Sequence, residues 1–375
     1  MMTTDSIGLY VHIPFCVSKC NYCDFCSLGG AYDRYIDAYV KTLLAEAERY
    51  KRGKKITVNT LYFGGGTPSL LSPEMLKKIL VGLEAVFDFG KLSEFTLEAN
   101  PGTLTPQKAK GFKALGVNRI SLGLQSIHNN ELKKLGRIHT FEDFLDSYKM
   151  LREVGFDNIS VDLMYGIPEQ TTESFCQTLS RVISLAPEHI SAYGLIIEEG
   201  TPFFDNRDFL ALPTEDDECD MYDMACQMLA DAGYIHYEIS NYSMPGYHSE
   251  HNLGYWRMRE YIGLGAAAYS YLDGERYGNP RSLERYLGGE LKTDVDTVDP
   301  DTEEKEYIMM RLRISDGIDL SEYCAKFAKS FLVGREEALS GYMKSELITL
   351  DKDRVALTER GFYLSNTIIC DLIDL

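Results

Sequence analysis

The chain has 375 residues, enough for one α/β barrel of about 250 residues together with a smaller domain. Apolar residues make up 45% and charged residues 25% of the chain, an ordinary globular composition that argues against a disordered protein. The formal net charge of −19 argues against binding to bare nucleic-acid phosphates or anionic lipid surfaces, because both require a positive field.

The first 240 residues alternate the patterns of strands and helices. Strands are predicted at residues 8–13, 58–63, 94–99, 119–124, 158–164 and 189–195. Helices are predicted at residues 32–50, from 72 onward, 105–116, 140–154, 172–185 and from 214 onward. Such units in series imply a parallel sheet with helices on its outer face. We therefore predict an α/β fold with a partial (β/α)6 TIM-like barrel over residues 1–240. An open doubly wound sheet is the alternative.

The pattern changes after Asn241. Helices are predicted at residues 303–312, 320–331 and 335–344, and strands 347–350 and 355–357 read as a hairpin. We predict a smaller C-terminal α+β domain over residues 241–375 that resembles a winged-helix module. Modules of this kind often bind DNA, but the acidic charge of the chain favours a packing or lid role.

Targeting signals are not recognisable in the sequence. The N-terminal segment 1–5 shows no charged region ahead of an apolar run, and no stretch of about 18 apolar residues occurs. We therefore expect a cytoplasmic protein with no transmembrane segment and at most peripheral membrane contact. Single cysteines fit small buried residues in a reducing compartment: Cys176, Cys219, Cys226, Cys324 and Cys370.

Three other cysteines form a compact motif directly after the first predicted strand. Cys16, Cys20 and Cys23 have the spacing C-x3-C-x2-C. Three thiolates on one short loop can hold three corners of an iron–sulfur cube and leave one iron open to a ligand. The alternatives are a zinc loop, which ordinarily shows two C-x2-C pairs some distance apart, a chance cysteine-rich turn, and a site closed by Cys26.

Polar residues and glycines end several of the predicted strands. A Gly-Gly-Gly-Thr-Pro run at residues 64–68 follows the second strand, and such glycines let the backbone approach a ligand closely. Glu98, Gln125 and Asp162 lie at or near the ends of later strands, and Arg137 lies in a loop. Because barrel sites collect at the carboxyl ends of the strands, we expect these residues to share one site.

Together these motifs resemble the radical S-adenosylmethionine (SAM) superfamily. Within it, the chain is similar to the subfamily of oxygen-independent coproporphyrinogen III oxidases (HemN) and haem chaperones (HemW). The matching segments are residues 10–16, 64–69, the strand with Glu98, 123–126 and 162–168. The resemblance implies a [4Fe–4S] cluster on the three cysteines, whose open iron binds SAM and whose electron cleaves it to a 5′-deoxyadenosyl radical. It also implies SAM contacts from Tyr10, Tyr22, Gly65, Gly66, Thr67, Glu98, Gln125, Arg137 and Asp162.

Three features favour the chaperone branch of this subfamily. Only fifteen residues precede Cys16, whereas the oxidases have a longer N-terminal arm. Phe25 stands where the oxidases have a fourth cysteine, and Cys26 comes one residue later, which argues against a catalytic role for that thiol. Residues 251–256, His-Asn-Leu-Gly-Tyr-Trp, resemble the H-N-x-x-Y-W motif of the chaperones.

The resemblance implies that His251, Tyr255 and Trp256 contact haem. A neutral imidazole is a good axial ligand to haem iron, and aromatic rings stack on flat macrocycles. The alternative is that His251 is hydrogen-bonded in the core while the aromatic rings pack a domain junction.

The predicted function is that of a haem chaperone with a cluster, SAM and haem as cargo. Its predicted partners are haem, haem-requiring recipient proteins and a cellular reductant, and no nucleic acid. The alternatives are oxidative decarboxylation of coproporphyrinogen III and a radical SAM reaction on an unrelated substrate, because the barrel motif identifies the radical source and not the target.

Overall fold

The computed structural model describes residues 6–30 and 33–374. The N-terminal segment 1–5, used above to argue against a signal peptide, lies outside the described residues. So does residue 32, the predicted start of the first helix.

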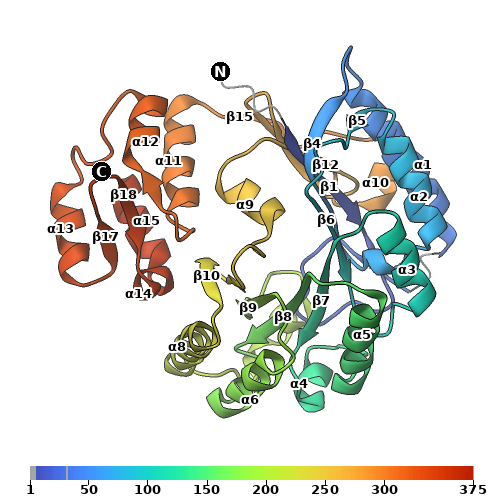
Figure 1. Ribbon diagram of the computed structural model, residues 1–375, viewed down its shortest axis with the longest axis horizontal. Helices are drawn as coiled ribbons and strands as arrows, with labels where there is room; N and C mark the ends of the chain where they lie inside the picture. The colour runs from blue at the N-terminus through green and yellow to red at the C-terminus, as the bar shows by residue number, and fades with distance from the viewer. Residues whose placement is uncertain (1–5, 31–32, 375) are drawn as a thin grey trace.

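A single curved sheet of 13 strands forms the centre of the molecule (Figure 1). Neighbouring strands in its middle run parallel, in the spatial order β9-β8-β7-β6-β4-β1. Their bounds are β1 (Ile7–Ile13), β4 (Ile56–Gly65), β6 (Glu94–Ala99), β7 (Arg119–Gln125), β8 (Ile159–Tyr165) and β9 (His189–Gly194). Among the described residues no pairing closes the sheet between its end strands, β10 (Ile235–Glu238) and β15 (Asp296–Thr297). The predicted partial (β/α)6 barrel is confirmed.

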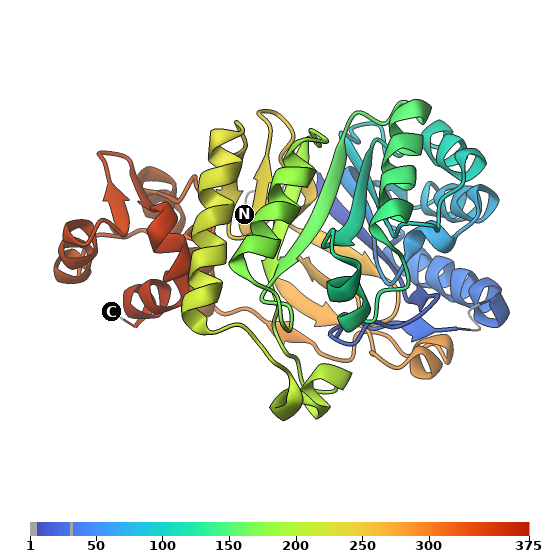
Figure 2. The same ribbon diagram turned by 90° about the horizontal axis from the view of Figure 1, so that it is seen from below.

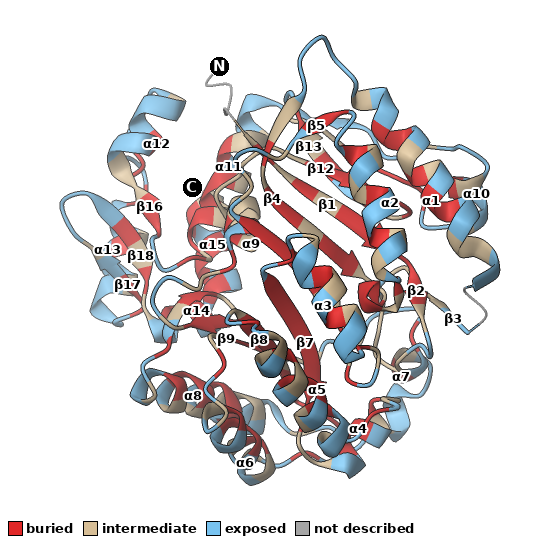
Figure 3. Cartoon of the chain, turned by 45° about the vertical axis from the view of Figure 1, so that its right-hand side comes forward, coloured by how far each residue is buried: buried red, intermediate tan, exposed pale blue. Residues whose placement is uncertain are grey.

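Helices cover the outer face of the sheet, where aliphatic strand residues are buried (Figure 3). They are α1 (Asp33–Ala47), α2 (Pro73–Leu83), α3 (Pro106–Ala114), α5 (Phe141–Val154), α6 (Thr172–Ile183) and α8 (Glu215–Asp231). Five of them begin after a Ser or Thr whose side chain accepts a backbone N–H of the first turn. This capping explains why their starts could be predicted.

The sheet continues beyond residue 240. β11 (Asn241–Ser243) pairs with β9, and β12 (Tyr261–Leu264) pairs parallel with β1. β13 (Tyr269–Leu272) and β14 (Glu275–Gly278) extend the sheet toward β15. The predicted domain division after residue 240 stays a prediction, although strands on both sides of it belong to one sheet.

The C-terminal residues form a small α+β unit beside α8 (Figure 2). Its sheet contains β16 (Ile318–Asp319), β17 (Ile348–Leu350) and β18 (Arg354–Leu357), and the last two form the predicted hairpin. Its helices are α11 (Pro300–Arg311), α12 (Leu320–Phe327), α13 (Glu336–Lys344), α14 (Glu359–Tyr363) and α15 (Ser365–Ile373). α14 contacts α8, which joins this unit to the barrel.

Helix α9 (Glu250–Trp256), which carries the His-Asn-Leu-Gly-Tyr-Trp segment, lies within the curve of the sheet (Figure 1). This helix has only seven residues, and the sequence pattern did not predict it. Within residues 6–30 and 33–374, no helix has the length and apolar character needed to cross a membrane.

Candidate functional site

The cysteine loop lies at the carboxyl end of β1. Cys16, Cys20 and Cys23 are free, half-buried thiols, and burial raises the pKa of Cys16 and Cys23. The Cys16 sulfur accepts a hydrogen bond from Thr67 Oγ1 at 3.5 Å, and the Cys20 sulfur accepts one from Arg137 Nη1 at 3.5 Å. The loop is therefore anchored to two of the predicted SAM residues.

Asn100, which the sequence analysis did not single out, connects these two anchors. Its Nδ2 donates to Thr67 Oγ1 at 2.9 Å, and its Oδ1 accepts from Arg137 Nη2 at 3.0 Å. Arg137 Nη2 also donates to the Gly123 carbonyl at 2.9 Å. A continuous hydrogen-bonded path therefore runs from Cys16 to Cys20. The available signal was the position of Asn100, directly after the strand that contains Glu98.

The donor set fits a cluster and a polar ligand. Among the described residues, no three His, Cys, Asp or Glu side chains lie close enough to hold a single metal ion. A four-iron cube does not require this, because each thiolate binds a different iron. Beside the loop, Arg137 Nε and Gln125 Oε1 are buried without a hydrogen-bond partner among the described residues. An unpaired guanidinium donor and an unpaired amide acceptor suit the carboxylate, ammonium and hydroxyl groups of SAM.

Glu98 is held by two donors on β4. Tyr62 donates to its Oε1 at 2.8 Å, and the Gly65 N–H donates to its Oε2 at 3.0 Å. Burial is the main cause that raises the pKa of Glu98 to about 7, and the nearby Asp162 adds to it. Asp162 itself accepts from Ser121 Oγ at 3.0 and 3.1 Å.

Gly65, the last residue of β4, and Gly66, which follows it, are required by packing against residues 12–15. A Cβ on Gly65 would lie 2.3 Å from His12 Cε1, and one on Gly66 would lie 2.7 Å from the Phe15 carbonyl oxygen. Gly65 also has φ of +107°, which L-residues with side chains rarely adopt. The expected close approach is present, but here it is an approach to residues 12–15 of the protein itself.

Tyr10 contacts the cysteine loop through His12, another residue that the sequence analysis did not single out. The Tyr10 hydroxyl is 3.0 Å from His12 Nδ1, and His12 Nε2 is 2.8 Å from the Cys26 carbonyl oxygen. Burial lowers the pKa of His12 to about 4, so the ring is neutral near pH 7. The Cys26 thiol donates to the Arg281 carbonyl at 2.9 Å, which anchors the loop to the segment after β14.

The remaining predicted SAM residue, Tyr22, is buried near Arg137. Burial raises the pKa of its phenol, and the positive charge of Arg137 opposes that rise. Tyr22 packs against a small apolar cluster that includes Leu135 and Phe203.

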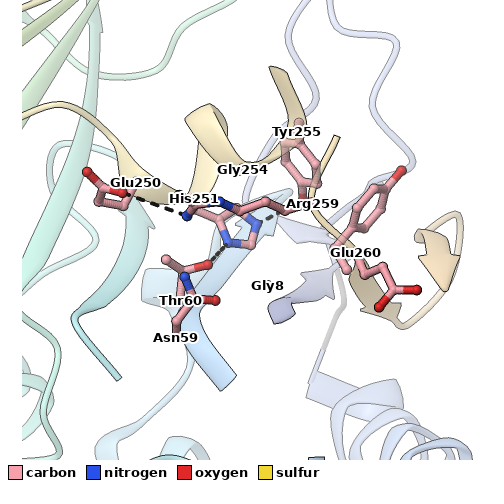
Figure 4. A pocket seen from close by; sticks show the side chains of 10 residues that line it. Gly8, Asn59, Thr60, Glu250, His251, Gly254, Tyr255, Arg259 and Glu260 are labelled. Carbon is pink, nitrogen blue, oxygen red and sulfur yellow. Dashed lines mark hydrogen bonds and ion pairs between the residues drawn. The ribbon is translucent and has the colours of Figure 1, made fainter. Parts of the chain in front are cut away.

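His251 lies on α9 and is engaged at both ring nitrogens (Figure 4). Nδ1 is 2.9 Å from Thr60 Oγ1, and Nε2 is 2.8 Å from the Tyr255 hydroxyl. The ring stacks on Tyr62 with centroids 5.1 Å apart. Burial, and to a smaller extent the charge of Arg119, lowers the pKa of His251 to about 3. The predicted haem contact of His251 stays a prediction.

Trp256 is directed to a different place from Tyr255. It packs against Leu253, Tyr237 and Ile314. Of the three predicted haem residues, His251 and Tyr255 are therefore in contact with each other. Trp256 instead packs against Tyr237 on β10 and Ile314, which follows α11.

Comparisons with known proteins agree with this architecture. The model of the radical SAM superfamily matches residues 10–182, and that of the HemN C-terminal domain matches residues 298–364. A protein named Heme chaperone HemW from Lactococcus lactis subsp. lactis is 38% identical over 364 residues, covering 96% of this chain and 95% of that protein. Its namesake from Escherichia coli is 37% identical over 382 residues, covering 98% of each chain.

Among solved structures, the coproporphyrinogen III oxidase HemN from Escherichia coli superposes with a TM-score of 0.84. The match covers 98% of this chain and 90% of that chain at 24% identity. The two proteins share a fold.

Proposed function

The chain belongs to the HemW family of the radical SAM superfamily, and from this premise we propose that it is a haem chaperone. It binds haem, carries a [4Fe–4S] cluster and SAM, and delivers haem to haem-requiring proteins. The observation that carries the proposal is the 37–38% identity to proteins named Heme chaperone HemW along nearly the whole of both chains.

Cys16, Cys20 and Cys23 hold the cluster in this proposal. The hydrogen bonds from Thr67 and Arg137 to two of the sulfurs stabilise thiolates, since donors to an anion strengthen as charge develops on it. Cluster and SAM, when bound, supply one-electron chemistry. We assign no ligand role to Cys26, whose thiol donates to the Arg281 carbonyl.

In this proposal, the SAM residues bind different groups of the ligand according to the charge of each group. Arg137 and Gln125 present the unpaired Nε and Oε1 atoms to its carboxylate and polar hydrogens. Glu98 and Asp162 accept from its hydroxyl or ammonium groups. Tyr10 and Tyr22 supply aromatic surface beside these groups.

The partners follow from the same proposal. A low-potential cellular reductant supplies electrons to the cluster, and haem-requiring proteins receive the cargo. We place the protein in the cytoplasm with at most peripheral membrane contact, and without a nucleic-acid partner, in keeping with its charge of −19.

The test is an anaerobic titration of the cluster-loaded protein with haem, followed by mixing with the apo-form of a haem protein. We expect saturable binding at one haem per chain and transfer of the haem to the acceptor. Conversion of coproporphyrinogen III to its divinyl product by the same preparation, without haem transfer, would contradict the proposal and identify an oxidase.

A further inference from the structure

We infer that haem binds in the groove between α9, strands β12–β14 and α11, and that His251 orients one wall of this groove instead of ligating the iron. The inference rests on the proposed function. The groove has a volume of about 240 Å³ and is bounded by residues from all of these elements.

The cavity directly beside His251 is too small for a macrocycle. It has a volume of about 10 Å³, room for about one water molecule (Figure 4). Both ring nitrogens of His251 are already hydrogen-bonded, and the side chain is buried. An axial role would require breaking one of these bonds and opening the core, whereas the groove next to it is open to solvent.

The groove has flat aromatic walls suited to a flat ligand. Tyr255, Tyr261 and Tyr271 line it, and all three rings are half-buried. Tyr255 meets Tyr261 edge to face, with centroids 4.6 Å apart. Rings arranged in this way offer both faces and edges to an aromatic macrocycle.

Three methionines line the same groove. Met258 follows α9, and Met309 and Met310 lie near the end of α11. Thioethers adapt their shape to an irregular apolar ligand and are also axial ligands of haem iron. The groove therefore contains candidate iron ligands whose sulfur atoms form no hydrogen bond with other described residues, unlike the ring nitrogens of His251.

Two arginines at the groove suit the two propionates of haem. Arg259 is 4.0 Å from Glu250, and Arg276 is ion-paired with Glu306, which also lines the groove. Each guanidinium has five donors, so each can bind a propionate while keeping its carboxylate partner. An apolar aromatic surface with two guanidinium groups, each with donors beyond those used by its own carboxylate partner, favours an amphipathic macrocycle that carries two carboxylates over one that carries none.

His251 acts on this groove through Tyr255. Its Nε2 bonds the Tyr255 hydroxyl, and its ring is held in turn by Thr60 and Tyr62. The interaction fixes the orientation of the ring that forms one groove wall. His251 is thus a positioning residue.

The test is a haem titration of the full-length, cluster-loaded protein, followed by the Soret absorbance. Arg259→Gln and Arg276→Gln are each expected to weaken haem binding about tenfold, the loss of one charge-assisted hydrogen bond. Met310→Trp, which fills the groove, is expected to weaken it further. Arg257→Gln is the matched control, because Arg257 is close in sequence but pairs with Asp316 at 2.8 Å outside the groove.

The dimethyl ester of haem lacks the propionate charges and should bind the wild type and both groove arginine variants equally.

A second pair of variants separates positioning from ligation. His251→Ala and Tyr255→Phe both break the hydrogen bond between these residues, so both should weaken binding similarly and leave the Soret position of bound haem unchanged. A shifted Soret band in His251→Ala alone would show that His251 ligates the iron. Unchanged haem affinity in Arg259→Gln, Arg276→Gln and Met310→Trp would show that haem does not bind in the groove. If the wild type binds no haem, the proposed function itself fails.

Discussion

Arg137 Nη2 donates a hydrogen bond to Asn100 Oδ1 at 3.0 Å. Asn100 directly follows β6, and Arg137 lies in the loop before α5. Arg137 contacts the sulfur of Cys20, and Asn100 contacts Thr67, which contacts the sulfur of Cys16. This link joins the cysteine loop to residues at the carboxyl end of the sheet. Its geometry therefore depends on residues far from it in sequence.

Asn100→Leu tests this dependence. The substitution leaves Thr67 and Arg137 each without one partner, so we expect a loss of stability of about 1–3 kcal/mol. A cluster held by a looser loop should also lose its iron faster to a chelator, which is measured as decay of the visible absorbance. Asn366→Leu is the control, because Asn366 accepts from Arg313 at 2.9 Å on the C-terminal unit. Equal decay rates in the two variants would refute the role of Asn100.

The cluster ligands are tested by single thiol-to-hydroxyl substitutions. Cys20→Ser should abolish the broad iron–sulfur absorbance and lower the iron content of reconstituted protein. Cys26→Ser should retain both, since the serine hydroxyl can still donate to the Arg281 carbonyl. Cys176→Ser, on α6, is the control for general effects of removing a thiol. Full iron content in Cys20→Ser would rule out the assignment.

Gly65→Ala is expected to destabilise the protein strongly. The added Cβ would lie 2.3 Å from His12 Cε1, and the backbone has φ of +107°. Gly102→Ala is a matched control, because φ is +78° there but no heavy atom of the described residues, apart from its chain neighbours, lies within 4 Å of the new Cβ. Strain from positive φ costs about 1–2 kcal/mol in either variant, and the clash adds to it in Gly65→Ala alone. Equal shifts in the midpoint of thermal unfolding would contradict this account.

The sequence predicted what depends on local pattern. The strands that carry Glu98 and Gln125 show apolar periodicity, and the capped helices α3 and α5 come after them in chain order, so the barrel could be recognised. The C-x3-C-x2-C spacing likewise identified the loop. These features can be recognised from residues that lie close together in the sequence.

The sequence did not predict what depends on contacts between distant residues. The partner of His251 Nδ1 is Thr60, 191 positions away, and β12 pairs with β1 only after the chain has completed the barrel. The residues next to His251 in the sequence therefore could not indicate whether its ring nitrogens are hydrogen-bonded. The C-terminal helix α15 was also missed, although Ile368, Ile369 and Leu372 have helical spacing.

The affinity for SAM should depend on pH through Glu98. The pKa of Glu98 is raised to about 7, so the carboxyl is increasingly protonated as the pH falls below that value. A protonated carboxyl is a weaker acceptor for the ammonium and hydroxyl groups of SAM. We expect affinity, measured by anaerobic titration, to fall between pH 8 and about pH 6. Glu98→Gln should bind more weakly at pH 8 and lose the part of the pH dependence that the ligand itself does not cause. An unchanged profile in Glu98→Gln would exclude Glu98 as the titrating group.

Stability toward acid should depend on buried histidines, and His236 offers a clean test. Burial lowers its pKa to about 4, and its Nδ1 has no partner among the described residues. Between pH 6.5 and 4 the unfolded chain binds a proton at this ring and the folded protein does not. The contribution of this ring to the free energy of unfolding is therefore complete above pH 6.5. It is lost as the pH falls toward 4, by up to about 1.4 kcal/mol per pH unit.

His236→Phe should remove that loss while keeping the stack on Tyr242, whose ring centroid lies 4.2 Å away. Thermal unfolding at pH 7 and pH 5 measures the effect, with a smaller drop in midpoint expected for the variant than for the wild type. Tyr222→Phe, in the same aromatic group, changes no proton uptake in this range and should keep the wild-type drop. If His236→Phe loses as much stability on acidification as the wild type, the ring is not buried in its neutral form.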